Sequence, residues 1–146
     1  MDPEKTVAEV VRAMRAGDDA AKMIGLALEE VTPGHARLSL KVERRHAQAL
    51  GICHGGVIFT LADSAFAYAC NSHGAPAVSQ HATISYLAPA RIGDVLVAEA
   101  REVHRAGRSG LYDIDVANQK GETVAVMRGA SRTVGDRRRE QTEEEG

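Results

Sequence analysis

The chain has 146 residues, of which 44% are hydrophobic and 26% are charged, which is typical of one soluble globular domain. Its net charge is −2 and only 3% of its residues are aromatic, so it lacks the basic surplus of a general nucleic-acid binder and has to fill its core with aliphatic side chains. The chain has two cysteines outside any CxxC pair, no signal-peptide pattern and no apolar run long enough to span a bilayer, so we expect a cytoplasmic protein that binds neither nucleic acid nor membrane.

The N-terminal third of the chain is predicted to form helices followed by a hairpin. Apolar residues recur every three or four positions over 6–16, which predicts an amphipathic helix that Gly17 ends, and a short helical turn follows over 20–24. Apolar and polar residues then alternate, as in "HARLSLKV", and this period predicts strands over 26–31 and 36–42. The segment after these strands has no clear period, so we expect a loop.

The rest of the chain is predicted to be one buried helix followed by strands. The run "VIFTLADSAFAYAC", residues 57–70, is almost entirely apolar, and "SHGAP" after it ends the helix. Strand patterns follow over 77–87, 95–105, 109–118 and 123–134. The short loops "RAGR" and "QKGE" join the last three, so we expect a four-stranded antiparallel meander.

These elements predict an α+β fold. The central helix is the only sufficiently apolar helix, so it is expected to cover one face of an antiparallel sheet of five or six strands. We divide the chain into an N-terminal helical segment over 1–25, one domain over 26–134 and a charged tail over 135–146. The tail "GDRRREQTEEEG" has no apolar side chain and is expected to be disordered.

Asp63 is the one carboxylate within the central helix. The residues three and four positions away from it include no cation, so its charge has no partner on its own helix. A carboxylate in apolar surroundings needs donors from elsewhere or its pKa rises, and either outcome makes it a candidate general base or nucleophile. The alternative is a structural carboxylate that faces solvent or is satisfied by backbone groups.

The sequence "HGG" stands directly before this helix, where no Ser, Thr, Asp or Asn provides a cap. The first amide groups of a helix have no internal partner, and two glycines let another group approach them closely. Because the helix dipole adds to this effect, the helix start is suited to an anion or a developing oxyanion. The alternative is that Gly55 and Gly56 only permit a tight turn into the helix.

The spacing of these two features indicates a dimer. Gly55 and Asp63 are eight positions apart, which is about 12 Å along a helix axis. An oxyanion donor and an attacking group must both lie about 3 Å from the reacting carbonyl, so one copy of the helix does not supply both. Two antiparallel copies do, and the small alanine side chains of the helix permit a close approach. We therefore expect a two-fold dimer with two shared sites.

Three segments of the chain, "GICHGGVIFTLADSAFAYACNSHG", "ISYLAPARIGD" and "LYDIDVANQKGETVAVMRG", closely resemble the hotdog-fold acyl-CoA thioesterases of the phenylacetate-degradation (PaaI) type. The resemblance extends over about residues 26–134. It implies a hotdog fold, a long central helix wrapped by the sheet, in a homotetramer built from dimers with the helices inside. It also implies hydrolysis of phenylacetyl-CoA or hydroxyphenylacetyl-CoA in phenylacetate catabolism, with coenzyme A as part of the substrate and no cofactor or metal.

The resemblance further implies roles for particular residues. Asp63 aligns with the general base or nucleophile, and Gly55 aligns with the amide that polarises the thioester carbonyl. His54 aligns with a residue that supports this end of the site. Ser79 is the match for a Ser or Thr that places the attacking water in some relatives, and Gln48 stands where some relatives have Asn.

The phosphates of coenzyme A require cations at the mouth of the site. The candidates are Arg91, Arg108, Arg128 and Arg132, although each is otherwise an ordinary solvated charge. Two alternatives to hydrolysis are a non-catalytic acyl-CoA binding protein, which has no need for Asp63, and a hotdog acyl-thioester dehydratase, which carries its His and acid in a different helix arrangement.

Other reactive side chains are expected to have no chemical role. Cys53 and Cys70 stand in apolar surroundings, which favours inert packing over nucleophilic chemistry. The histidines His35, His46 and His104 are expected at the surface.

Overall fold

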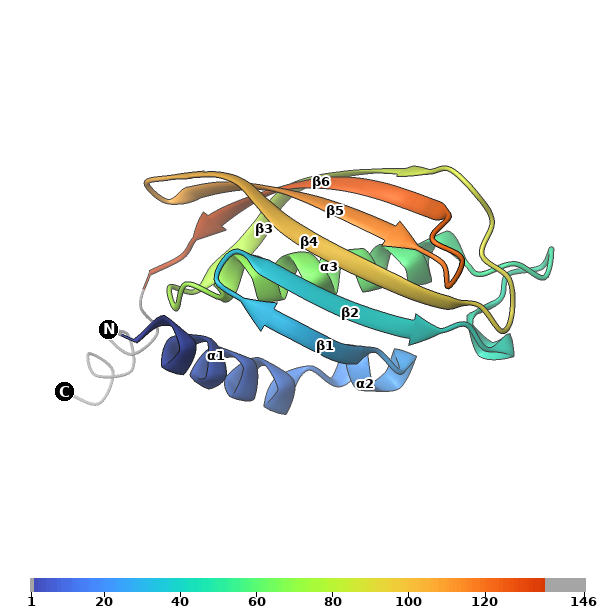
Figure 1. Cartoon of the computed structure of the whole chain (residues 1–146), viewed down its shortest axis with the longest axis horizontal. Helices are drawn as coiled ribbons and strands as arrows, with labels where there is room; N and C mark the ends of the chain where they lie inside the picture. Colours follow the sequence, from blue (N-terminus) through green and yellow to red (C-terminus); the bar gives the residue numbers. More distant parts are fainter. Residues whose placement is uncertain (1, 136–146) are drawn as a thin grey trace.

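The computed structural model describes residues 2–135. In chain order its elements are α1 (Pro3–Gly17), α2 (Asp19–Ile24), β1 (Ala27–Thr32), β2 (His35–Lys41), the 3-10 helix η1 (Arg44–His46), α3 (Gly55–Asn71), β3 (Ala77–Tyr86), β4 (Val95–Ala106), β5 (Ser109–Ala117) and β6 (Thr123–Thr133). The sheet curves over α3, while α1 and α2 run along the side of the fold near β1 (Figure 1). The predicted charged tail lies outside the described residues, apart from Gly135.

The strands of the described chain form one antiparallel sheet in the order β1-β2-β4-β5-β6-β3. The predicted α+β class is therefore confirmed. The predicted four-stranded meander is wrong for β3, which pairs with β6 and not with β4. The short loops do make β4, β5 and β6 consecutive neighbours. The longer loop after β3 carries the chain across the sheet to β4, which pairs with β2 and β5, so β3 is left as an edge strand.

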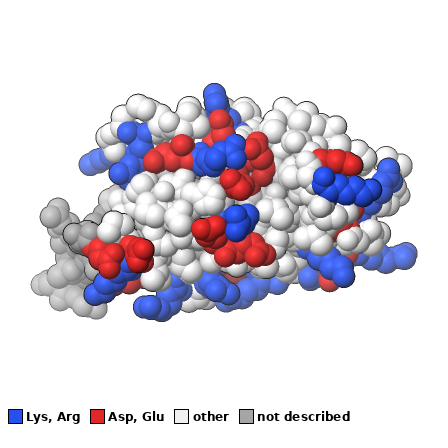
Figure 2. Space-filling model, viewed as in Figure 1, with Lys and Arg blue, Asp and Glu red and all other residues white. Residues whose placement is uncertain are grey.

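The two faces of the sheet differ because side chains alternate along each strand. The face toward α3 carries aliphatic side chains such as Leu38, Leu96 and Ile114, each of which is 2% exposed or less. Their removal from water is the main stabilising contribution to the fold. The opposite face carries charged side chains, and Figure 2 shows that acidic and basic groups lie next to one another across it.

Phe66 fixes the position of α3 on the sheet. Its ring packs against Tyr112 of β5 with the ring centroids 5.4 Å apart. On β6, a β-carbon at Gly129 would lie 2.8 Å from the Phe66 ring, so only glycine permits this approach. Asp63 precedes Phe66 by about one helical turn. The contact therefore also fixes how deeply the carboxylate of Asp63 sits in the fold.

The helix α3 begins two residues earlier than predicted, because both glycines of "HGG" already belong to the helix. The other predicted helices and strands are present, with bounds shifted by a few residues. Within residues 2–135, no helix has the length and apolar character needed to cross a membrane.

Candidate active site

The start of α3 leaves one backbone amide available to a ligand. His54 is the N-cap residue, and its Nδ1 accepts a hydrogen bond from the N–H of Gly56 at 2.9 Å. Its carbonyl accepts hydrogen bonds from the N–H groups of Val57 and Ile58. His54 thus caps the helix in place of the Ser, Thr, Asp or Asn that is usual at this position. The N–H of Gly55 has no acceptor among residues 2–135, so it is the amide that can meet an oxyanion.

Tyr86, at the end of β3, packs against this glycine. Its hydroxyl donates a hydrogen bond to the carbonyl of Gly55 at 2.8 Å. A β-carbon at Gly55 would lie 3.2 Å from the Tyr86 ring, so the close contact favours glycine. Our sequence reasoning missed Tyr86, because it stands far from "HGG" along the chain and no local period marks it.

Gln48 and Gly55 line one cavity of about 360 Å³, together with Tyr86 and the loop over 87–90. The side-chain oxygen of Gln48 accepts a hydrogen bond from the N–H of Leu50 in its own loop. The amide nitrogen of Gln48 has no acceptor within the described chain, so it is the part of the side chain that can bind a ligand.

His46 holds the loop that carries "HGG" and is buried, so the prediction that it lies at the surface is wrong. The residue is 4% exposed, and both of its ring nitrogens have backbone partners, as a buried polar group requires. Nδ1 accepts a hydrogen bond from the N–H of Glu43 at 2.9 Å, and Nε2 lies 2.7 Å from the carbonyl of Ile24. The His46 carbonyl accepts a hydrogen bond from the N–H of His54 at 2.8 Å, which positions the helix start.

Asp63 is half-buried on α3, and its carboxylate accepts no hydrogen bond from the described residues. Burial raises the pKa of this carboxyl above its ordinary value of 3.8, because the charged form loses hydration without gaining a partner. Among residues 2–135, no backbone group satisfies the Asp63 carboxylate, so the interpretation of Asp63 as such a structural carboxylate does not hold there. Such a group is suited to act as a base or nucleophile.

A groove of about 930 Å³ passes Asp63 between α3 and α1. Ser79, near the start of β3, lines the same groove, so the structure brings together the predicted base and the predicted water-positioning hydroxyl. The remainder of the α3 wall near Asp63 is largely apolar and includes Phe66, Ala67 and Cys70.

The groove and the Gly55 cavity are separate within one chain. None of the residues that line the groove also lines the cavity at the helix start. The two parts lie about 12 Å apart along α3, at about 1.5 Å per residue. A single described chain therefore presents an amide donor at one place and an acid at another.

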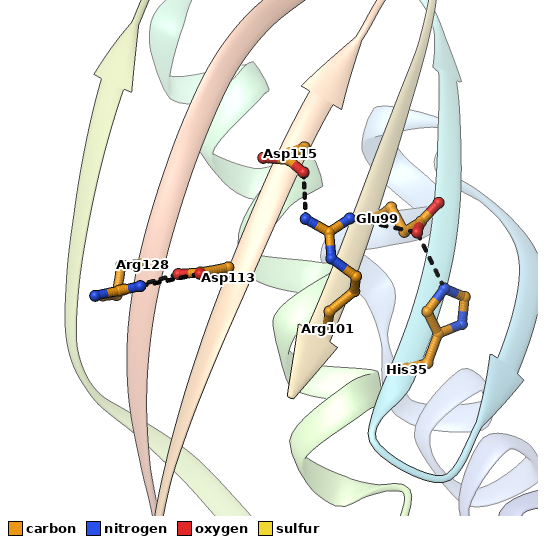
Figure 3. Close-up of polar contacts among 6 residues, drawn as sticks. All are labelled: His35, Glu99, Arg101, Asp113, Asp115 and Arg128. Carbon is orange, nitrogen blue, oxygen red and sulfur yellow. Dashed lines mark hydrogen bonds and ion pairs between the residues drawn. The ribbon is translucent and has the colours of Figure 1, made fainter. Parts of the chain in front are cut away.

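The four candidate arginines lie in different places. The guanidinium of Arg128 binds both carboxylate oxygens of Asp113, at 2.7 and 3.0 Å, on the outer face of the sheet (Figure 3). Arg91 follows the cavity-lining Ala90, close to Gly55, and the Arg91 backbone forms a bridge with Ile52. The two others lie on the β5–β6 side of the sheet: Arg108 is in the β4–β5 turn, where its carbonyl accepts a hydrogen bond from the N–H of Thr133, and Arg132 is on β6 opposite Ser109.

The cysteines are buried thiols, as predicted. Burial raises the pKa of Cys53 to about 11 and that of Cys70 to about 12, so neither is a thiolate near neutral pH. Among residues 2–135, no three side chains of His, Cys, Asp or Glu are grouped closely enough to hold a metal ion.

The profile of the thioesterase superfamily matches residues 50–125, from the loop before "HGG" to the start of β6. The chain belongs to this superfamily. It is 42% identical to acyl-coenzyme A thioesterase PaaI of Escherichia coli (strain K12), over 84% of this chain and 88% of that protein. It is 31% identical to acyl-coenzyme A thioesterase 13 of Homo sapiens, over 85% of this chain and 91% of that protein. The helix α1 lies outside the part matched by the profile.

Solved structures of relatives share the fold. The E. coli PaaI protein from the phenylacetic acid degradation operon matches with a TM-score of 0.89 and 38% identity, over 92% of this chain and 97% of that chain. A thioesterase protein from Streptococcus pneumoniae, solved with coenzyme A, matches with a TM-score of 0.73 and 28% identity, over 76% and 90% of the two chains. The chain is thus a hotdog-fold acyl-CoA thioester hydrolase of the PaaI type, as its motifs predict.

Proposed function

We propose that this thioesterase hydrolyses phenylacetyl-CoA or hydroxyphenylacetyl-CoA in phenylacetate catabolism, with Asp63 as its catalytic base or nucleophile. The half-buried carboxylate of Asp63, which has no partner in the described chain and borders an apolar groove, carries this proposal. The E. coli PaaI protein supports the substrate class, because it comes from a phenylacetic acid degradation operon.

Two routes use the ionised carboxylate of Asp63. In the first, Asp63 takes a proton from water while the water oxygen bonds to the thioester carbon, and the C–S bond then breaks as the proton passes to the leaving thiolate. In the second, Asp63 itself attacks the thioester carbon, the thiolate leaves, and water hydrolyses the resulting anhydride. Both routes give a free acid and coenzyme A.

The N–H of Gly55 is proposed to donate a hydrogen bond to the thioester oxygen, where negative charge develops during attack. His54 supports this role because its ring occupies the N–H of Gly56 and leaves the Gly55 amide for the ligand. Since one chain separates Gly55 from Asp63, we propose that each site joins Gly55 of one protomer to Asp63 of the partner subunit. Such dimers are proposed to pair as a homotetramer with the α3 helices inside.

Ser79 is proposed to position the attacking water beside Asp63, and Gln48 to contact the substrate through its amide nitrogen. The S. pneumoniae relative offers support for Ser79, because it was solved with alanine in place of an aspartate and of a threonine. Those two positions are sixteen residues apart, as are Asp63 and Ser79 in this chain.

Arg91 and Arg108 are the proposed partners of the coenzyme A phosphates. Arg91 lies next to the cavity at Gly55, and neither guanidinium forms an ion pair within the described residues. Arg128 would first have to leave Asp113, which makes it a weaker candidate.

Release of free thiol from a panel of acyl-CoA substrates tests this proposal. We expect turnover to be fastest with phenylacetyl-CoA or hydroxyphenylacetyl-CoA, and binding of the same compounds is measured in parallel. Acyl-CoA binding without thiol release would instead identify a non-catalytic binding protein. Single-turnover hydrolysis in ¹⁸O-labelled water, followed by mass measurement of the protein, distinguishes the two routes, because only direct attack labels Asp63.

A further inference from the structure

The groove beside Asp63 has two helical walls, and the second wall comes from α1. Three α1 side chains one turn apart, Thr6, Val10 and Met14, line the groove together with Glu9 and Ala13. Residues four positions apart lie on the same face of a helix, so this stripe of α1 faces Asp63 and the other groove residues of α3.

The two helices run in opposite directions, so the groove follows both of them. Figure 1 shows α1 starting at the side of the fold where α3 ends. Thr6 lies next to Gly74 just beyond α3, where a β-carbon on Gly74 would be 2.9 Å from Thr6 Cγ2. From Thr6 to Met14 the helix rises about 12 Å, about the same as from Asn71 back to Asp63. The groove therefore extends from the carboxylate to the end of α3.

The middle of the groove is apolar. Val10 and Met14 face it from α1, and Phe66 and Cys70 face it from α3. The nearby amide of Asn71 is already used, because it donates to the carbonyls of Ala67 and Ala77 and accepts from the N–H of Ala77. The open polar side chains of the lining include those of Asp63, Ser79 and Glu9, whereas the side chains in the middle of the groove offer van der Waals contact, so the complement of this middle section is an apolar acyl group.

We propose that α1 is the specificity wall of this thioesterase, and that Val10 and Met14 limit the length and width of the acyl group that fits beside Asp63. This inference rests on the proposed function, because it takes the groove as the acyl-binding part of the site. The wall lies outside the region matched by the superfamily profile, so acyl preference can differ between relatives while the α3 machinery is retained.

Two neighbouring valines of α1 give a matched test. Val10 lines the groove, whereas Val11 packs against the hydrophobic core and does not line it. We expect Val10→Ala to raise the ratio of kcat/KM for decanoyl-CoA over kcat/KM for phenylacetyl-CoA by about tenfold, since a few methyl groups change such ratios by about that much. Val11→Ala should leave the ratio within about twofold of its original value, because its side chain does not meet the acyl group.

A larger side chain at position 10 should narrow the groove instead of widening it. Val10→Phe should lower kcat/KM for phenylacetyl-CoA and decanoyl-CoA while sparing acetyl-CoA, whose acyl group does not reach the wall. Melting temperatures of all variants show whether each remains folded. An unchanged ratio in folded Val10→Ala, or an equal shift in Val11→Ala, would overturn the specificity wall. Failure of the original chain to hydrolyse any acyl-CoA would instead overturn the proposed function.

Discussion

Two aspartates of this protein, Asp63 and Asp113, have opposite surroundings. Asp63 lies on the buried helix, and burial without a partner raises its pKa. Asp113 lies on the outer face of the sheet, where the hydrogen bond from the Arg128 guanidinium is the main cause that holds its pKa below the usual value. These surroundings suit Asp63 to its proposed role as base or nucleophile and suit Asp113 to stable ionisation.

Surroundings, and not residue type, therefore distinguish the proposed reacting group Asp63 from the structural carboxylate Asp113. On the outer face, each carboxylate oxygen of Asp113 accepts a hydrogen bond from the Arg128 guanidinium. The inner helix places Phe66 and Ala67 near Asp63 and gives it no donor within the described chain. A carboxylate that lacks partners is costly to the fold, which is a reason to expect that it serves the reaction.

Replacement of the two aspartates by asparagine should give the largest difference. We expect Asp63→Asn to lower kcat by about 100-fold or more, because asparagine neither accepts a proton nor attacks a carbonyl. Asp113→Asn is the matched control and should retain most of the activity. Thiol release and the melting temperature of both variants provide the measurements. Equal activity in the two variants would remove Asp63 from the reaction.

Substitution of Gly55 tests the other half of the proposed site. Gly55→Pro removes the N–H that meets the oxyanion, whereas the control Gly55→Ala keeps the N–H and makes a similar contact with Tyr86. We expect Gly55→Pro to lose about 100-fold in kcat beyond the loss in Gly55→Ala, as is typical of an oxyanion donor. His54 has φ −61° and ψ 134°, which suits a residue that precedes proline.

Mixed dimers sharpen this test. A protomer with Asp63→Asn and a protomer with Gly55→Pro together retain one intact site per heterodimer if the sites are shared. Tagged heterodimers should then recover about half of the original activity, one site of two. Heterodimers as inactive as either parent would show that each chain uses its own Gly55 and Asp63.

The pH profile should differ from that of an ordinary aspartate. Both catalytic routes need ionised Asp63, so kcat/KM should fall as the pH decreases through its raised pKa, at a pH above 3.8. The free energy of unfolding should change in the opposite direction. Because the folded state binds this proton more tightly, the Asp63 contribution to stability decreases as pH rises from 3.8 through the raised pKa.

The Asp63→Asn variant serves as the control for this prediction, since it lacks the titrating group. Its stability above pH 3.8 should equal or exceed that of the original chain, as measured by denaturant unfolding at several pH values. A lower stability of this variant across that range would mean that Asp63 has a stabilising partner.

The smallest effect concerns coenzyme A. Arg91→Ala should raise KM for acyl-CoA a few-fold with little change in kcat, because a phosphate contact outside the reacting atoms contributes binding in the ground and transition states alike. Arg128→Ala should leave KM unchanged, because its guanidinium is held by Asp113. Initial rates over a range of substrate concentrations give KM for both variants. A larger rise in KM for Arg128→Ala than for Arg91→Ala would contradict the assignment of Arg91 to the coenzyme A phosphates.

Sequence patterns predicted the helices and most of the sheet, because the spacing of buried residues within a helix or strand depends only on positions that are close together in the chain. They predicted Asp63 and Gly55 for the same reason, since a carboxylate in an apolar helix and two glycines at its start stand out without any tertiary contact. They misplaced β3, because alternation along a strand does not say which neighbour it pairs with. They also missed Tyr86 and the burial of His46, whose roles depend on contacts with Gly55 and Ile24 that lie far away along the chain.

The missing side chain of Gly129 sets a geometric condition for the whole enzyme. The Phe66 ring packs directly against the backbone of β6 at Gly129, so no side chain separates the helix from the sheet at this point. A larger residue at position 129 would tilt α3 or push it away from the sheet. Because Asp63 lies about one turn before Phe66 on the same helix, its carboxylate would move as well. A buried position on β6, between β5 and β3, thereby controls the position of the proposed reacting group.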